Sequence, residues 1–232
     1  TTASPGGYVL DSVPGLYHNV LVLDFKSLYP SIIRTFFVDP LALATADEDE
    51  APVEGFLDAR FSRTRHILPG ITETLWQARD AAKVAEDVPL STAVKIIMNS
   101  FYGVLGTPAC RFYNPNIANA ITGQGRYLLL WSKAWFEAQG FNVLYGDTDS
   151  LFVSAGDMTS VEAYERSSGL AAELTADLAD HIATTWQVES RLTMEFEKLY
   201  ERLFLPQVRH GTGGARKRYV GSIFSGSSKA EA

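Results

Sequence analysis

The stretch Val20-Leu21-Val22-Leu23-Asp24-Phe25 joins an apolar run to a carboxylate. A short apolar run of this kind predicts a buried strand. Asp24 closes the run, and a carboxylate there is costly to bury without a partner. Ser27 suits a helix cap and Pro30 suits a first helical turn, so we expect a helix to follow as far as about Phe37.

The rest of the chain predicts helices and strands in a mixed order. Two stretches, at about 71–85 and 90–105, predict an antiparallel helical hairpin. Gly146-Asp147-Thr148-Asp149 separates two alternating stretches, which predicts a β-hairpin with carboxylates at its tip. The predicted fold class is therefore α+β, an antiparallel sheet with an inserted antiparallel helical hairpin. The other expected elements are helices at 115–139 and 160–187 and strands at 141–145, 150–154, 191–197, 201–208 and 217–224.

Composition and charge fit a globular chain. The 232 residues are 46% hydrophobic and carry a net charge of −7, which argues weakly against nucleic acid as a partner. Cations can still cluster locally, and a site for divalent metals needs uncompensated carboxylates. Residues 45–54 predict a solvated acidic loop, and the tail 225–232 is expected to fray.

Cysteine and hydropathy indicate the cellular setting. The single cysteine, Cys110, permits no intramolecular disulfide and favours a reducing, cytoplasmic compartment, where it would serve as a small buried apolar residue. No apolar run approaches the roughly 20 residues of a membrane helix, so we expect no membrane. The chain lacks an initiating methionine, which favours an excised domain.

Three aspartates, Asp24, Asp147 and Asp149, end or join predicted strands. An antiparallel sheet can bring the first strand's end beside the hairpin tip, where the carboxylates would repel one another. A pair of Mg²⁺ ions would compensate that charge and would suit phosphoryl transfer. The alternative is structural, because aspartate is common in turns for backbone reasons alone.

The predicted helical hairpin carries cations at helical spacing. Arg79 and Lys83 are four residues apart, as are Lys95 and Asn99, and Tyr102 follows three residues later. Each set lies on one helical face, and three converging cations would suit a triphosphate. The alternative is an ordinary solvated face. The positions that can face the core on the second helix are Ile96, Ile97, Met98 and Phe101.

A second basic cluster, Arg216-Lys217-Arg218-Tyr219, is expected on a strand after the Gly211-Thr212-Gly213-Gly214 loop. Cations beside an aromatic ring can follow a nucleic-acid backbone. A basic edge strand that discourages aggregation is the equal alternative.

The motifs together resemble the B-family DNA polymerases. Residues 24–33 (DFKSLYPSII) are similar to the first palm motif, residues 95–103 (KIIMNSFYG) to the fingers motif, and residues 145–150 (YGDTDS) to the second carboxylate motif. Lys217-Arg218-Tyr219 resembles the short basic motif near the end of the palm. The sequence between the motifs is most similar to that of the bacterial DNA polymerase II branch.

The resemblance implies a role for each matching residue. Asp24 and Asp149, with the backbone carbonyl of Phe25, would hold two Mg²⁺ ions, for which Mn²⁺ can substitute, and Asp147 would contribute less directly. Glu195 or Glu197 would be a supporting carboxylate. The nucleotide would be held by Ser27, Leu28, Tyr29, Arg79, Lys83, Lys95 and Asn99, with Tyr29 excluding a 2′-hydroxyl and Lys95 able to donate a proton. DNA would be bound by Tyr102, Gly103, Lys217, Arg218 and Tyr219.

The resemblance also implies a domain plan and partners. Residues 1–68 and 107–224 would form the palm, residues 69–106 the fingers, and residues 225–232 the tail, without exonuclease and thumb domains. We therefore expect the catalytic fragment of a larger polymerase, acting on primer–template DNA and deoxynucleoside triphosphates. The alternatives are a non-catalytic palm that binds or scaffolds, and an RNA-synthesising nucleotidyltransferase.

Overall fold

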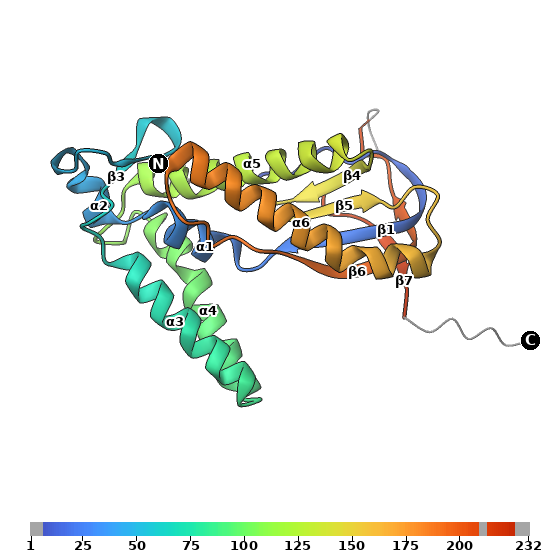
Figure 1. The fold of residues 1–232 in the computed structure, drawn as a ribbon, viewed down its shortest axis with the longest axis horizontal. Coiled ribbons are helices and arrows are strands. Elements are labelled where there is room, and N and C mark those ends of the chain that lie inside the picture. The colour runs from blue at the N-terminus through green and yellow to red at the C-terminus, as the bar shows by residue number, and fades with distance from the viewer. Residues whose placement is uncertain (1–6, 209–212, 226–232) are drawn as a thin grey trace, which may run out of the picture. The chain divides into compact units, whose positions relative to one another are not determined.

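The computed structural model describes residues 7–208 and 213–225, which form two compact units (Figure 1). Of the described residues, the first unit contains 27–125 and 179–192, and the second contains 7–26, 126–178, 193–208 and 213–225. The chain passes between the units after Lys26, Gly125, Leu178 and Leu192. The expected tail at 226–232, and Gly211 and Thr212 of the expected loop, lie outside the described residues.

The second unit is built on a five-stranded antiparallel sheet in the order β4-β5-β1-β6-β7. The predicted apolar strand is its centre, because β1 pairs with β5 on one side and β6 on the other. The side chains of Leu21 and Leu23 are fully buried, as the apolar run requires. The strands are β1 (Gly15–Phe25), β4 (Asn142–Asp147), β5 (Ser150–Ser154), β6 (Met194–Leu205) and β7 (Val220–Ile223).

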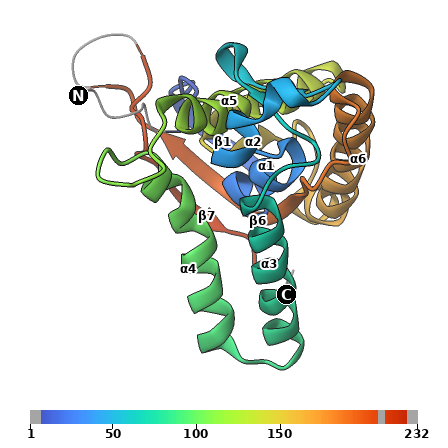
Figure 2. The ribbon, with the colours of Figure 1, turned by 90° about the vertical axis from the view of Figure 1, so that its left-hand side faces the viewer.

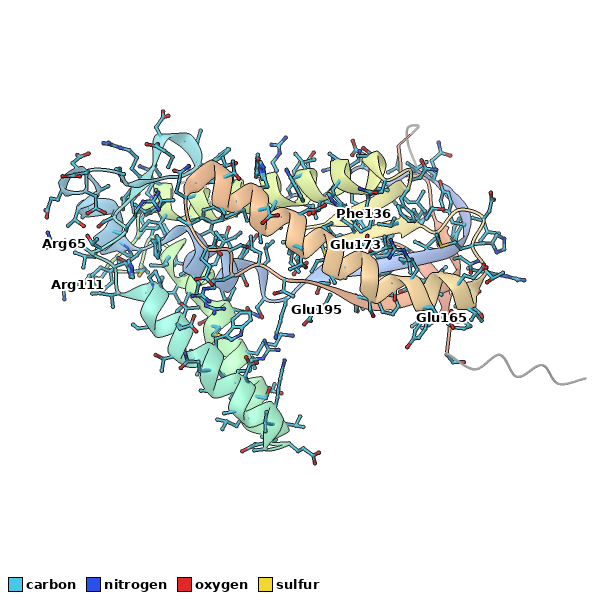
Figure 3. The ribbon with its side chains drawn as sticks, in the orientation of Figure 1. Arg65, Arg111, Phe136, Glu165, Glu173 and Glu195 are labelled. Carbon is cyan, nitrogen blue, oxygen red and sulfur yellow. The ribbon has the colours of Figure 1, made fainter. Side chains whose placement is uncertain are left out.

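Two helices cover one face of this sheet (Figures 1 and 2). They are residues 126–138 of α5 (Pro115–Ala138) and residues 160–178 of α6 (Ser160–Trp186). The indole of Trp135 donates a 2.7 Å hydrogen bond to Asp177, which ties the two helices together. Phe136 of α5 is fully buried over the sheet (Figure 3). The opposite face carries a separate apolar cluster that includes Val20, Val22, Tyr145, Phe152 and Tyr200.

The first unit contains the predicted helical hairpin, with α3 (Leu68–Val84) and α4 (Val88–Leu105) side by side (Figure 2). Asp87 caps α4 by accepting a hydrogen bond from the backbone N–H of Leu90, so Asp87 both separates the helices and begins the second one. The hairpin is joined in this unit by α1 (Leu28–Phe36), α2 (Pro40–Ala44), η1 (Ala46–Glu48), β2 (Val53–Glu54), η2 (Phe56–Asp58) and β3 (Arg60–Phe61).

Three strand and helix-start predictions need correction. The expected strands 191–197 and 201–208 are one strand, β6, because residues 198–200 between them also pair with β1, opposite residues 20–22. Lys217 lies in a turn, with φ of 56°, and β7 begins only at Val220. Ser27 occupies the N-cap position of α1 with φ of 47°, but its side chain makes no capping hydrogen bond.

Two burial predictions also need correction, and one loop is more ordered than expected. Ile96 and Ile97 are exposed, and α4 instead buries Val94, Met98 and Leu105. Cys110 is only half-buried. The acidic loop is partly structured, because Asp49 accepts hydrogen bonds from the hydroxyls of Ser62 and Thr64.

Within the described residues, α4 alone has the length and apolar composition of a membrane span. The sequence predicted no apolar run of that length. Lys95 and Asn99 interrupt its apolar surface, and a single helix of this kind is weak evidence for a membrane.

Candidate active site

The carboxylates predicted at the strand ends share one level of the sheet. In register, Asp24 of β1 is opposite Ser150 of β5, and Ser150 is opposite Asp147 of β4. On the other side, Asp24 is opposite Glu195 of β6, which Figure 3 labels. Because directly opposite residues point to the same face, Asp147, Asp24 and Glu195 lie in one row across four neighbouring strands, with Ser150 of β5 between the two aspartates.

Asp149 lies in the turn and is bonded to the end of the central strand. Its backbone carbonyl accepts a 2.9 Å hydrogen bond from the N–H of Phe25. The turn is tight, since Thr148 between the two aspartates has φ of 58°, a left-handed conformation that is uncommon for a β-branched residue. The Thr148 hydroxyl donates to Oδ1 of Asp147 at 3.1 Å, which orients that carboxylate.

A preceding segment of the chain braces this turn. The backbone carbonyl of Tyr8 accepts a 2.8 Å hydrogen bond from the N–H of Thr148, and the N–H of Leu10 donates to the carbonyl of Gly146. The guanidinium of Arg126 lies over the ring of Tyr8, 4.3 Å from its centre. The strained turn is thus held from outside the hairpin, as such conformations must be.

Electrostatically, the turn has an excess of negative charge. Burial raises the pKa of Asp149 above its ordinary value, and the charges of Asp147 and Glu197 raise it further, while Lys217 lowers it. Lys217 forms an ion pair with Asp147, 3.2 Å from Nζ to Oδ1. A pocket of about 340 Å³ opens here, lined by Tyr145, Asp147, Thr148, Asp149, Ser150, Phe152, Lys217 and Tyr219.

These residues fit a hard divalent cation in chemistry. Carboxylate and backbone carbonyl oxygens are the donors that Mg²⁺ prefers, and surplus negative charge at Asp149 favours a cation. Among the described residues, however, no three His, Cys, Asp or Glu side chains form a ready metal cluster. A metal would therefore need further oxygens from the backbone, from water or from a substrate. This suits Mg²⁺, which proteins usually bind through one or two carboxylates together with water and substrate phosphates.

The first unit positions the predicted nucleotide-binding residues. Arg79 of α3 donates a 3.1 Å hydrogen bond from Nη1 to the hydroxyl of Ser27, at the start of α1. In the part of the chain that the structure describes, Nε of Arg79 is buried without a hydrogen-bond partner. The rings of Tyr29 and Tyr102 are in contact, with centres 4.7 Å apart. The exposed members of the set are Lys83, Lys95 and Asn99, and Gly103 of the predicted DNA-binding residues is also exposed.

Comparison with known proteins decides the family. The sequence profile of DNA polymerase family B matches residues 2–232. The chain belongs to DNA polymerase family B. DNA polymerase II of Escherichia coli (strain K12) is 48% identical over 97% of the chain and 29% of that protein. This identity confirms the resemblance to the bacterial DNA polymerase II branch.

More distant relatives extend beyond bacteria. A DNA polymerase of Archaeoglobus fulgidus is 30% identical over 93% of the chain and 26% of that protein. The DNA polymerase alpha catalytic subunit of Sterkiella nova is 33% identical over 74% of the chain and 14% of that protein. The chain therefore spans less than a third of the length of these family B relatives.

The fold of this family B chain brings together the predicted residues within each unit. Asp24, Phe25, Asp147 and Asp149 lie at the same end of the sheet, and Lys217 and Tyr219 line the same pocket as the two hairpin aspartates. Ser27 meets Arg79, and Tyr29 meets Tyr102. Arg218 is exposed and lines a neighbouring pocket with Arg216 instead.

Sequence reasoning missed two residues at this site. Tyr8 was not predicted because its contribution is a backbone carbonyl, which leaves no mark on side-chain patterns. Tyr145 lies in the stretch YGDTDS but was not predicted to act at the site. Its hydroxyl accepts a 3.0 Å hydrogen bond from the N–H of Lys217. A tyrosine that is almost fully buried with a polar contact could have been suspected from the apolar strand around it.

Proposed function

We propose that this family B chain carries out template-directed DNA synthesis by two-metal-ion nucleotidyl transfer. A deoxynucleoside triphosphate would react with a primer 3′-hydroxyl. The observation that carries the proposal is the row of carboxylates at the end of β1 and the β4–β5 turn, with excess negative charge at Asp149. The names of the family and of its relatives support the same reaction.

In this proposal, Asp24, Asp149 and the carbonyl of Phe25 hold the metals, and Asp147 contributes less directly. Two Mg²⁺ ions, replaceable by Mn²⁺, would supply charge stabilisation for the attacking and leaving oxygens. Two hydrogen bonds support the turn before substrate arrives: the Thr148 hydroxyl donates to the Asp147 carboxylate, and the Phe25 N–H donates to the backbone carbonyl of Asp149. Phosphoryl transfer depends mainly on such positioning and charge compensation.

The first unit would bind the incoming nucleotide. The backbone N–H groups of Ser27 and Leu28 lie at the start of α1, where a helix favours phosphate. The side chains that would hold the triphosphate are Arg79, Lys83, Lys95 and Asn99, and Lys95 would also donate a proton to the leaving pyrophosphate. Tyr29 would exclude a 2′-hydroxyl.

The resemblance assigns DNA contacts to five residues of this chain. Tyr102 and Gly103 would pack beside the nascent base pair, and Lys217, Arg218 and Tyr219 would bind the primer terminus. Since the chain spans less than a third of its relatives, we propose that it works with further polymerase domains, an exonuclease and a thumb. The bacterial relative supports a cytoplasmic setting.

Primer extension tests the proposal directly. The purified chain is given a primed DNA template and deoxynucleoside triphosphates with Mn²⁺ and then with Mg²⁺. We expect extension by the wild type and a loss of at least a hundredfold in Asp149→Asn, because a metal-binding charge is removed.

If the isolated chain extends no primer, the wild-type and Asp149→Asn sequences are each placed between the exonuclease and thumb domains of a longer family member. Extension by the wild-type graft alone supports the proposal. Silence of the wild-type graft, with DNA binding retained, would instead identify a non-catalytic palm.

A further inference from the structure

Lys217 makes two contacts that hold it against the carboxylate turn. Its ammonium is 3.2 Å from Oδ1 of Asp147, and its backbone N–H donates to the hydroxyl of Tyr145 at 3.0 Å. It also lines the pocket that contains Asp149. The ammonium therefore stands where a cation is electrostatically favoured.

The backbone conformation at Lys217 fixes the position of its side chain. Its φ of 56° is left-handed, a conformation that a non-glycine residue adopts only when its surroundings hold it there. The holding group is Tyr145, which is 1% exposed and packs against Phe152 and Tyr219. A buried aromatic cluster thus fixes the point from which the lysine reaches Asp147.

The neighbouring cation behaves differently. Arg216 is as exposed as Lys217, with 65% of each side chain accessible, but it pairs with Asp11, 3.1 Å away. Of these two adjacent cations, the Lys217 side chain pairs with a carboxylate of the turn and the Arg216 side chain pairs elsewhere. The comparison separates a specific counter-ion from a general excess of positive charge.

We propose that Lys217 is a built-in counter-ion that competes with a divalent cation for the Asp147–Asp149 turn and leaves it when a nucleic-acid phosphate draws the ammonium away. The inference rests on the proposed function, which gives the turn its metal and Lys217 its DNA contact. Its consequence is that DNA binding and metal binding strengthen each other, because such coupling is reciprocal.

Mn²⁺ binding measured by electron paramagnetic resonance of the free ion, without DNA or nucleotide, tests the first half. We expect Lys217→Met to bind Mn²⁺ roughly threefold to tenfold more tightly than the wild type, because one positive charge near a doubly charged ion is removed. Arg216→Met removes an equally exposed charge one residue away and should leave the affinity unchanged. Lys217→Arg keeps the charge and should also match the wild type.

Titrations with a primed DNA duplex test the second half. DNA should increase the Mn²⁺ affinity of the wild type by a larger factor than that of Lys217→Met, in which no ammonium has to leave. Equal Mn²⁺ affinity of Lys217→Met and Arg216→Met would overturn the counter-ion role of Lys217. An equal effect of DNA on the Mn²⁺ affinity of the wild type and of Lys217→Met would overturn the release of Lys217 on DNA binding.

Asp149→Asn keeps the two proposals distinguishable. If this variant binds Mn²⁺ as well as the wild type, the proposed metal site itself is wrong. If Asp149→Asn loses the ion but Lys217→Met behaves like the wild type, only the inference about Lys217 is wrong. Circular dichroism of every variant checks that the fold is retained.

Discussion

At the scale of single residues, the ionised carboxylate of Asp149 is disfavoured by its surroundings. Burial, and then the charges of Asp147 and Glu197, raise its pKa above the ordinary value of 3.8. The folded state therefore holds the Asp149 proton more tightly than the unfolded state. The stability that protonated Asp149 contributes is fully present below pH 3.8 and is lost as the pH rises through its folded-state pKa.

Asp149→Asn should accordingly raise the thermal unfolding midpoint at pH 7 when divalent metal is absent. Asparagine carries no charge to bury, so the gain should disappear near pH 3.5, where aspartate is largely neutral in both states. Differential scanning calorimetry at the two pH values measures this. Mg²⁺ should stabilise the wild type but not the variant, and a variant less stable than the wild type at pH 7 would contradict the charge argument.

Tyr29 is the residue on which the choice of sugar is proposed to depend. Its ring is half-buried and packs against Tyr102 at 4.7 Å between ring centres, so the ring position is fixed by a neighbour. A fixed ring can exclude a 2′-hydroxyl by its bulk.

In a sequence that extends primers, Tyr29→Ala should raise the ratio of kcat/KM for ribonucleotides over deoxyribonucleotides by roughly tenfold to a hundredfold. Tyr29→Phe keeps the ring and should keep the discrimination. Steady-state incorporation of matched ribonucleotide and deoxyribonucleotide pairs measures the ratio. An unchanged ratio in Tyr29→Ala would remove the proposed role and leave RNA synthesis open as an alternative.

At the scale of elements, the helical hairpin is fastened to α1 by one buried cation. Arg34 of α1, whose side chain is 8% exposed, pairs with Glu73 of α3 at 2.6 Å. Its guanidinium also lies over the ring of Trp76, 4.3 Å from the centre. One side chain thus makes both a polar and a stacking contact with the base of α3, which the periodicity of the sequence did not indicate.

Arg34→Ala should lower the free energy of unfolding by about 1–3 kcal/mol, because it removes the stacking contact on Trp76 and the ion pair with Glu73. Lys133→Ala breaks the exposed pair with Glu137 on α5 and should cost less than about 0.5 kcal/mol. Urea denaturation of both variants makes the comparison. Equal losses would show that burial of Arg34 adds nothing to its ion pair.

At the scale of the whole molecule, neither compact unit is a continuous stretch of sequence. The central strand β1 needs β5 and β6 on its two sides, and these strands lie more than a hundred residues further along the chain. The proposed metal ligands therefore come together only when distant segments pair. The predicted division into palm and fingers, at 1–68, 69–106 and 107–224, stays a prediction.

The sequence by itself determined the family, the α+β class, the helical hairpin and the carboxylates at the ends of strands. These features rest on local patterns, namely an apolar run, helical periodicity and turn residues. Such patterns depend on residues that are close together in the sequence. Motif order then identified the B-family resemblance that the profile match confirmed.

Only the tertiary structure decided how those parts meet. The unbroken strand β6, the buried face of α4, the carbonyl of Tyr8 that braces Thr148, and the pairing of Lys217 with Asp147 all depend on contacts between distant segments. The physical reason is that backbone hydrogen bonds, register and ion pairing are properties of pairs of residues in space. A one-dimensional pattern of side chains does not specify those pairs.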